Sequence, residues 1–216
     1  MKTGFLILFL ITTLLAGCTK TNSLEEKGKK MEENKDAQLD TATFGSGCFW
    51  CSEAIFERLN GVKSVTSGFS GGERPNPTYE EVCTGRTDHA EVIQIAFDPK
   101  VISFDKLLEV FWKTHDPTTL NRQGADVGTQ YRSVIFYHND EQKNKAKKYK
   151  EELNKEGIWD NPIVTEISPF KNFYSAEEYH QEYYDKNPNA GYCSFVITPK
   201  IEKFKKIFKD RLKKDK

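Results

Sequence analysis

Apolar residues recur along the chain with two different periods, and each period predicts one type of element. In residues 49–59 the apolar side chains return at helix-like intervals, and Asn60-Gly61 then ends the pattern. Residues 90–97 instead alternate apolar and polar side chains, which is typical of a strand. The same criteria predict further strands at residues 41–45, 62–69, 133–137 and 163–167, and helices at 103–112, 139–156, 176–184 and 201–212.

The order of these elements limits the fold. Strands and helices alternate along most of the chain, but no helix is predicted between the strands at 62–69 and 90–97. This mixture favours helices packed on one sheet over a fully wound parallel sheet. The sequence therefore predicts an α+β fold of one domain, a two-layer α/β sandwich with a ferredoxin-like core and long loops.

The first forty residues differ in composition from the rest. Lys2 precedes a largely apolar stretch at 3–16, which is too short for a comfortable membrane span, and Leu-Leu-Ala-Gly-Cys occupies 14–18. This end resembles the processing motif of bacterial lipoproteins, in which cleavage before the cysteine leaves its thiol acylated. We therefore expect a lipoprotein signal peptide at 1–17, an acylated Cys18 with a flexible charged tether at 18–40, and a folded catalytic domain at 41–216.

By this expectation the protein is exported and lipid-anchored on the extracytoplasmic face of a bacterial membrane. The alternative is an ordinary cleaved signal in which Cys18 is incidental. Acylation of Cys18 would account for the odd number of cysteines, five, because it leaves four for other chemistry.

Composition changes this picture only slightly. Lysine plus arginine equals aspartate plus glutamate, at 32 each, so no overall field draws the protein toward nucleic acid. The 15 Phe, 9 Tyr and 3 Trp supply enough bulky apolar area for one core. We interpret the lysine-rich end at 200–216 as a solvated helix face rather than a contact with a membrane or a nucleic acid.

The clearest chemical signal is Gly-Cys-Phe-Trp-Cys at 47–51. A cysteine that follows a strand and opens a helix meets unpaired N–H groups and the positive end of the helix dipole, which both stabilise a thiolate. Cys48 is therefore a candidate nucleophile, although most free cysteines are merely small buried hydrophobes. Cys48 and Cys51 form a C-x-x-C pair, which suits redox chemistry. Zinc needs about four ligands, and because the chain has no second close pair we expect no metal.

Around this motif the chain resembles the A-type peptide-methionine sulfoxide reductases, from about residue 43 to residue 200. Several motifs in the same order are far more specific than any one alone. They are Gly-Cys-Phe-Trp at 47–50, Gly-Phe-Ser-Gly-Gly at 68–72, Asn-Pro-Thr-Tyr at 76–79, Thr-Asp-His-Ala-Glu at 87–91, His-Asp-Pro at 115–117, Gly-Ala-Asp-Val-Gly-Thr-Gln-Tyr-Arg at 124–132 and Gly-Tyr-Cys at 191–193.

The resemblance implies a role for each matching residue. Cys48 is the nucleophile, and Phe49 and Trp50 line an apolar slot for the methyl group of the sulfoxide. Glu91 is the acid that gives a proton to the sulfoxide oxygen, although its strand position alone would suggest a solvent-facing residue. The remaining catalytic residues are Tyr79 and Tyr131, which hydrogen-bond the same oxygen, and Asp126, which orients a water.

The implied reaction reduces methionine S-sulfoxide, free or in oxidised proteins and peptides, and so repairs proteins. Attack converts the cysteine to a sulfenic acid and releases methionine, and a second thiol then forms a disulfide that a thioredoxin-like dithiol reduces. No tightly bound cofactor is implied, and we expect a monomer.

The resolving thiol is where this chain departs from a common family form, which has glycine in place of Cys51 and two cysteines near the C-terminus. Cys193 lies in a Gly- and Asn-rich stretch whose composition predicts enough mobility to reach the site. Cys51 lies one turn along the same helix as the nucleophile, where first-turn geometry puts strain on a bridge. Both stay candidates, and we interpret Cys83, His89 and His115 as structural.

Two other functions remain open from the sequence. One is a general thiol–disulfide oxidoreductase that uses the Cys48–Cys51 pair, and it would prefer insulin disulfides to methionine sulfoxide. The other is a lipoprotein binding module whose cysteines are structural staples in an oxidising compartment, and it would have fully paired, unreactive cysteines.

Overall fold

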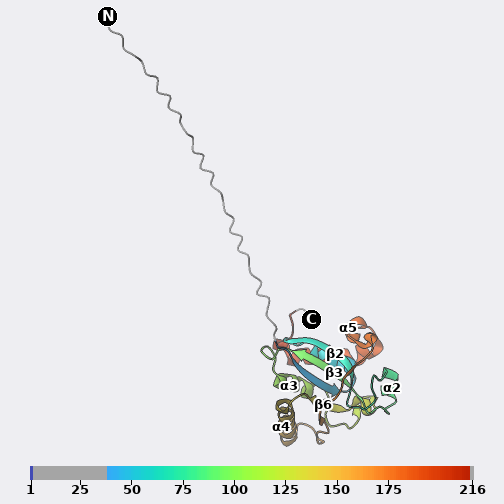
Figure 1. Cartoon of the computed structure of the whole chain (residues 1–216). Helices are drawn as coiled ribbons and strands as arrows, with labels where there is room; N and C mark the ends of the chain where they lie inside the picture. Colours follow the sequence, from blue (N-terminus) through green and yellow to red (C-terminus); the bar gives the residue numbers. More distant parts are fainter. Residues whose placement is uncertain (2–37, 215–216) are drawn as a thin grey trace. The chain divides into compact units, whose positions relative to one another are not determined.

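The computed structural model describes Met1 and residues 38–214 (Figure 1). The expected signal peptide, Cys18 and nearly all of the expected tether lie outside the described residues. Within the described part of the chain, no helix combines the length and the apolar character that crossing a membrane requires.

One mixed sheet of six strands organises the domain, in the order β7-β6-β1-β3-β2-β8. Its central strands pair antiparallel with one another and are β1 (Asp40–Ser46), β2 (Val62–Ser70), β3 (Ala90–Phe97) and β6 (Ser133–Tyr137). The edge strands are β7 (Glu166–Pro169), parallel to β6, and β8 (Tyr174–Ser175), antiparallel to β2.

The connections between the central strands identify the topology. α1 (Phe49–Phe56) joins β1 to β2, and α3 (Phe104–Thr114) joins β3 to β6. The central elements therefore follow the β-α-β-β-α-β order of the ferredoxin-like fold. The predicted ferredoxin-like α+β core is confirmed.

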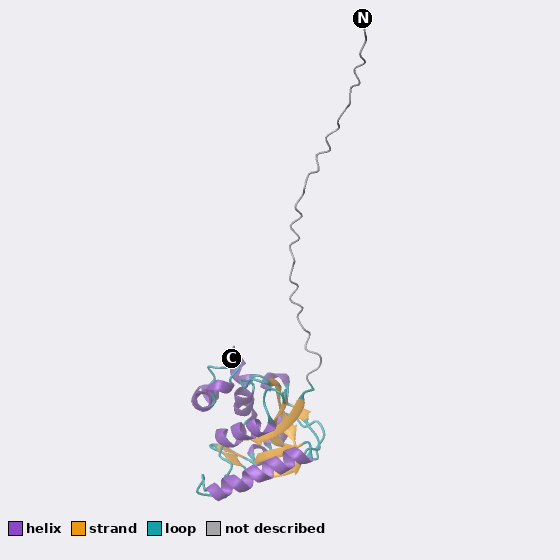
Figure 2. Ribbon diagram, turned by 90° about the vertical axis from the view of Figure 1, so that its left-hand side faces the viewer, coloured by secondary structure: helices purple, strands orange, loops and turns teal. Residues whose placement is uncertain are grey.

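The helices and the sheet form two layers (Figures 1 and 2). α1, α3, α4 (Asp140–Glu156) and α6 (Thr198–Ile207) contribute to the main core against one face of the sheet. On the other face a small second cluster packs against Phe170 and Phe173 from a loop. One face of the sheet therefore carries nearly all of the buried apolar contacts.

An aromatic cluster fills the centre of the main core. The ring of Phe44 on β1 lies 5.1 Å from that of Phe111 and 5.8 and 5.9 Å from those of Phe56 and Phe104. Phe44, Phe56 and Phe111 are almost completely buried. Truncating a buried phenylalanine to alanine costs about 3–5 kcal/mol, so this cluster fixes α1 and α3 on the sheet.

Most of the predicted helices and strands form at or near the residues that the apolar pattern predicted. The strands predicted at 90–97 and 133–137 have those boundaries. The Ser103 side chain accepts a hydrogen bond from the N–H of Lys106 and caps α3, at the start of the helix predicted at 103–112. α4 begins after Asn139, whose side chain caps it by accepting from the N–H of Gln142.

Three predicted boundaries are wrong. The helix predicted at 176–184 is only a 3-10 turn, Glu178–His180, followed by the short α5 (Tyr183–Lys186), because Glu182 has a positive φ of 53°. The strand predicted at 163–167 begins only at Glu166. The helix predicted at 201–212 begins at Thr198, after a π turn at Cys193–Ile197, and ends at Ile207.

Candidate active site

The nucleophile motif lies at the junction of β1 and α1. Gly47 has φ +91°, and a side chain there would meet the Gln123 side chain at 2.6 Å, so only glycine fits this turn. Cys48 follows as the N-cap of α1, and its carbonyl accepts hydrogen bonds from the N–H groups of Cys51 and Ser52. The predicted position of Cys48 at the opening of a helix is confirmed.

The carboxyl group of Glu91 lies directly beside this helix start. Its Oε2 accepts a hydrogen bond from the N–H of Phe49 at 3.1 Å, and the residue is only 1% exposed. Burial raises the pKa of Glu91 to about 8, against the lowering effect of the Phe49 N–H, and the charges of Asp126 and Cys51 raise it further. Below that pH the site therefore contains a neutral carboxyl that can donate a proton.

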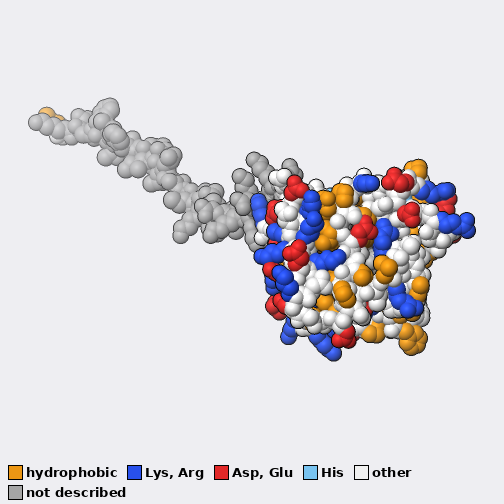
Figure 3. Space-filling model, turned by 90° about the horizontal axis from the view of Figure 1, so that it is seen from below, with side chains coloured by type: hydrophobic (Ala, Val, Ile, Leu, Met, Phe, Trp, Pro, Cys, Tyr) orange, Lys and Arg blue, Asp and Glu red, His pale blue; other side chains and the backbone are white. Residues whose placement is uncertain are grey.

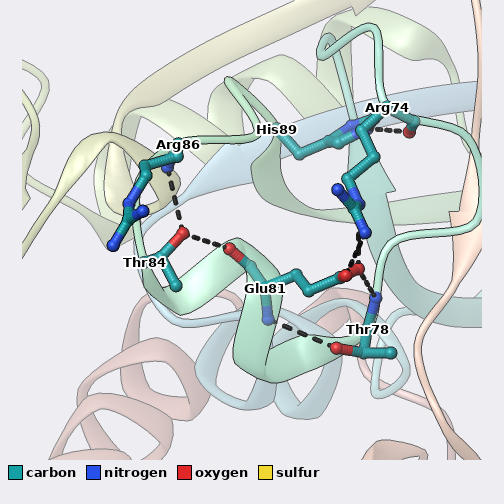
Figure 4. Close-up of polar contacts among 6 residues, drawn as sticks. All are labelled: Arg74, Thr78, Glu81, Thr84, Arg86 and His89. Carbon is teal, nitrogen blue, oxygen red and sulfur yellow. Dashed lines mark hydrogen bonds and ion pairs between the residues drawn. The ribbon is translucent and has the colours of Figure 1, made fainter.

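Tyr79 is presented by a helix that the sequence did not predict. α2 (Tyr79–Cys83) lies between β2 and β3, where the sequence predicted no helix. The N–H of Glu81 donates to the Thr78 hydroxyl, the Thr78 N–H donates to the Glu81 carboxylate, and Arg74 binds the same carboxylate (Figure 4). This capping box stabilises five residues that have no apolar periodicity.

Aromatic rings surround the first turn of α1. The Phe49 ring stacks on Tyr79 with centroids 6.3 Å apart, and Trp50 stacks on Tyr183 at 3.7 Å. Desolvation by these surroundings raises the pKa of Tyr79, so its phenol stays a hydrogen-bond donor. Phe49 and Trp50, which we expected to line an apolar slot, are thus both held in place by stacking against tyrosine rings.

His180 connects several of these rings and was not predicted as a site residue. Its ring lies 4.4 Å from that of Tyr79 and 5.1 Å from that of Phe49, and its Nδ1 accepts a hydrogen bond from the Trp50 indole at 3.1 Å. Burial lowers the pKa of His180, so the ring is neutral. Only the tertiary fold brings His180 to Trp50, because 130 positions separate them in the sequence.

The opposite side of the site comes from a loop with two short elements, β5 (Asp126–Val127) and a 3-10 turn at Thr129–Tyr131. The Asp126 carboxylate accepts a hydrogen bond from the Tyr192 hydroxyl at 2.6 Å. Tyr131 is partly buried against the main core, and burial and the charges of Glu91 and Cys48 raise its pKa. The structure therefore brings all five predicted catalytic residues together.

Cys48, the N-cap of α1, and Cys51, within α1, have pKa values that shift in opposite directions, whereas we expected a lowered pKa at Cys48. The Cys48 thiol is 8% exposed, and burial, its hydrogen bond to Cys51 and the Glu91 charge raise its pKa. The pKa of Cys51 is lowered to about 7, chiefly by the hydrogen bond from Cys48 and also by Lys200 and Tyr192. The prediction that the helix end lowers the Cys48 pKa is wrong, because desolvation outweighs it.

The other two cysteines also differ from expectation. Cys193 is completely buried in the π turn rather than in a mobile segment, and burial and the Cys51 charge raise its pKa. Cys83, which we expected to be structural, is exposed at the end of α2, and its sulfur accepts a hydrogen bond from the Tyr79 hydroxyl. All four cysteines of residues 38–214 are free thiols.

His89 and His115 have structural hydrogen bonds, as predicted. His89 accepts from the N–H of Gly72 and binds the carbonyl of Arg74. His115 binds the Phe111 carbonyl and the Ser133 hydroxyl, and burial lowers its pKa to about 4.

The described residues form neither a metal-binding cluster nor, on the face seen in Figure 3, a patch of one charge. Among the described residues, no three His, Cys, Asp or Glu side chains are grouped closely enough to hold a metal ion. On the face shown in Figure 3, basic and acidic side chains are interspersed. The buried thiols and the buried carboxyl at the start of α1 are thus the chemically distinctive groups of this site.

Comparison with known proteins places this geometry in a family. A family model described as peptide methionine sulfoxide reductase matches residues 40–212. The peptide methionine sulfoxide reductase MsrA of Nautilia profundicola is 56% identical over 169 residues, which cover 78% of this chain and 96% of the relative. The MsrA of Sulfolobus acidocaldarius is 56% identical over 177 residues, which cover 80% of this chain and 97% of the relative.

Solved structures agree with the sequence relatives. A reduced-form crystal structure from Saccharomyces cerevisiae has a TM-score of 0.66 at 42% identity and covers 73% of this chain and 90% of that chain. Methionine sulfoxide reductase A of Corynebacterium diphtheriae has a TM-score of 0.64 at 38% identity and covers 74% of this chain and 80% of that chain. This chain therefore belongs to the peptide methionine sulfoxide reductase family.

Proposed function

We propose that this protein reduces methionine S-sulfoxide to methionine, with Cys48 as the nucleophile and Glu91 as the proton donor. The observation that carries the proposal is the buried Glu91 carboxyl, protonated below a pH of about 8, within 3.1 Å of the N–H that follows Cys48. Sulfoxide oxygen leaves sulfur only after it is protonated, so a thiol and a neutral carboxyl at one place suit this reaction.

The first step needs a thiolate on Cys48. The thiol of Cys48 donates a hydrogen bond to Cys51, so its proton can pass along that bond when Cys51 is a thiolate. The Cys48 thiolate attacks the sulfoxide sulfur while Glu91 protonates the oxygen, and the phenols of Tyr79 and Tyr131 hydrogen-bond that oxygen. The protonated oxygen leaves as water, and Cys48 is then bonded to a sulfonium sulfur. A water molecule attacks the Cys48 sulfur, the bond between the two sulfurs breaks with its electron pair on methionine, and a proton is released. Cys48 is left as a sulfenic acid, and methionine, reduced by two electrons, leaves.

The second step removes the sulfenic acid. We propose that Cys51 condenses with it to a Cys48–Cys51 disulfide and releases water. Cys51 supports this role because it already shares a hydrogen bond with Cys48 and has a pKa of about 7. Cys193 is the weaker candidate, since its thiol is completely buried and its pKa is raised.

Serine variants distinguish the two candidates for resolution. Without reductant, Cys51→Ser is expected to release one methionine per chain and to keep the sulfenic acid on Cys48. Its steady-state turnover with a dithiol protein should fall at least about tenfold, because the internal disulfide no longer forms. The measurements are methionine released in one turnover and mass-spectrometric mapping of the oxidised peptides.

Cys193→Ser is the matched control, and we expect it to keep both the Cys48–Cys51 disulfide and the steady-state rate. A Cys48–Cys193 disulfide in the unaltered protein, or loss of turnover only in Cys193→Ser, would contradict the proposed role of Cys51.

The family relationship does not favour a general thiol–disulfide oxidoreductase. The free thiols at all four described cysteines are also not the arrangement of a stapled binding module. Oxidised proteins and peptides are the proposed substrates, a thioredoxin-like dithiol the reductant and a monomer the working unit. An assay that compares methionine S-sulfoxide with insulin disulfides separates the reductase from the oxidoreductase.

We further propose that the protein is a lipoprotein anchored on the extracytoplasmic face of a bacterial membrane. The support is Leu-Leu-Ala-Gly-Cys at 14–18 after an apolar stretch. In bacteria that express the full chain and are fed an alkyne fatty acid, the protein should be labelled and sediment with membranes. Cys18→Ser should abolish the label, and an unlabelled native protein would contradict the proposal.

A further inference from the structure

Lys200 belongs to α6 and reaches Cys51 on α1 across the fold, from 149 positions later in the sequence. Its Nζ donates a hydrogen bond to the Cys51 sulfur at 3.9 Å. The Tyr192 hydroxyl lies 4.0 Å from the same sulfur. Cys51 is thus contacted from α1 by a thiol and from the C-terminal segment by an ammonium and a phenol.

The π turn before α6 explains how both groups reach one sulfur. Tyr192 directly precedes the turn at Cys193–Ile197, and Lys200 lies in the first turn of α6. A π turn has i→i+5 hydrogen bonds, here from the N–H of Thr198 to the carbonyl of Cys193, so it is wider than an α turn. Buried Ile201 and Phe204 then hold α6 in the core.

We propose that Lys200 is a positioning residue that holds Cys51 as a thiolate, so that the sulfenic acid on Cys48 is resolved within one turn of α1. The inference rests on the proposed function. It gives a role to a lysine that the sequence alone placed on a solvated, lysine-rich helix face. The Lys200 side chain also lines a surface cavity of about 350 Å³ with Lys203 and Trp159.

The charge of Lys200 acts twice in the cycle. First, Cys51 thiolate attacks the sulfur of Cys48–SOH, the S–S bond forms, and the departing hydroxide takes a proton to become water. Later a thiolate of the external dithiol attacks Cys48, Cys51 leaves as a thiolate beside the ammonium, and the second thiol of the reductant completes its own disulfide. In the first step Lys200 raises the fraction of Cys51 that is present as the attacking thiolate. In the second step Cys51 is the leaving group, and a leaving thiol with a lower pKa leaves faster.

Other titratable groups face Cys51 and set the background for this effect. Asp126 raises the pKa of Cys51 and Tyr192 lowers it, while Cys48 has the largest lowering effect. Among these groups of the described residues, Lys200 is the cation, and its charge lowers the pKa of Cys51. The groups of the described residues that interact with Cys51 are Cys48 on α1, Glu91 on β3, Asp126 on β5, Tyr192 and Cys193 at the π turn, and Lys200 on α6.

The test compares the pH dependence of the full-length protein with that of Lys200→Gln. The alkylation rate of Cys51, followed by mass spectrometry, should have its midpoint about one pH unit higher in the variant. Formation of the Cys48–Cys51 disulfide after one turnover should be about fivefold slower at pH 7 and nearly normal at pH 9, because the thiolate then forms without help. Lys200→Arg should restore both profiles.

Lys203→Gln is the matched control, because Lys203 is an exposed lysine of the same helix and the same cavity. An unchanged alkylation midpoint in Lys200→Gln, or an equal loss of rate at every pH, would overturn the inference. If the unaltered protein releases no methionine in one turnover, the proposed function itself fails. If it releases one methionine per chain, but Cys51 alkylation and Cys48–Cys51 disulfide formation in Lys200→Gln match those of the unaltered protein at every pH, only the role of Lys200 fails.

Discussion

Replacing Cys48 with serine is expected to reduce the kcat for methionine sulfoxide by at least about three orders of magnitude. A serine hydroxyl at this site remains protonated and is a poor nucleophile toward sulfoxide sulfur. Steady-state assays with a chemical dithiol, which does not depend on a protein partner, measure the effect.

The serine is nearly isosteric with the 8%-exposed cysteine, so the fold should persist, and the thermal unfolding midpoint checks this. A Cys48→Ser protein that unfolds at the normal temperature and keeps a near-normal rate would refute the assignment of the nucleophile.

Glu91→Gln is expected to slow turnover by about 10²- to 10⁴-fold while substrate binding is retained. The amide keeps an oxygen for the N–H of Phe49 but has no acidic proton for the sulfoxide oxygen. The loss should therefore be in kcat rather than in KM, and initial-rate kinetics separate the two.

The pH profile of the unaltered protein gives an independent readout of Glu91. The pKa of Glu91 is raised to about 8, so the donor form is present below that pH and is lost as the pH rises through it. On the acid side the Cys48–Cys51 pair releases its first proton near the Cys51 pKa of about 7. We expect kcat/KM to be bell-shaped between these values, and the alkaline fall to vanish in Glu91→Gln.

Glu53→Gln is the matched control for the carboxyl. Glu53 is also buried on α1, burial also raises its pKa, to about 7, and its carboxylate accepts a hydrogen bond from the N–H of Glu182 rather than from Phe49. We expect this variant to keep the alkaline fall. Unchanged turnover in Glu91→Gln, or an equal loss in Glu53→Gln, would contradict the role of Glu91.

The sequence predicted the fold well where one local period decided the element. The alternation in β3 and the capping serine of α3 depend only on neighbouring residues. α2 was missed because its five residues have no apolar period and depend on a capping box that also recruits Arg74. The helix predicted at 176–184 is interrupted by the positive φ of Glu182, next to Gln181, whose side chain binds the backbone of Ser67.

The burial of Glu91 could have been predicted from the alternating pattern of its strand. Glu91 lies an even number of positions from Ile93, Ile95 and Phe97, which are all buried, so the period of two places it on the core face of β3. A charged residue in phase with an apolar face is the signal, and the suggestion that strand position alone makes it solvent-facing was wrong.

Other features of the site could not come from the sequence. His180 and Lys200 reach α1 from 130 and 149 positions away, through a segment whose π turn has no local signature. The raised pKa of Cys48 and the lowered pKa of Cys51 depend on burial and on contacts that form only in the folded domain.

A single turnover in the presence of a sulfenic-acid trap shows whether the Cys48 sulfur becomes a sulfenic acid as methionine is released. Reduced Cys51→Ser protein is mixed with an excess of methionine S-sulfoxide and dimedone, and free methionine and modified peptides are quantified. Our account predicts one methionine per chain from the S epimer and a dimedone adduct on Cys48. Methionine release without an adduct at that sulfur, or an adduct confined to another cysteine, would contradict it.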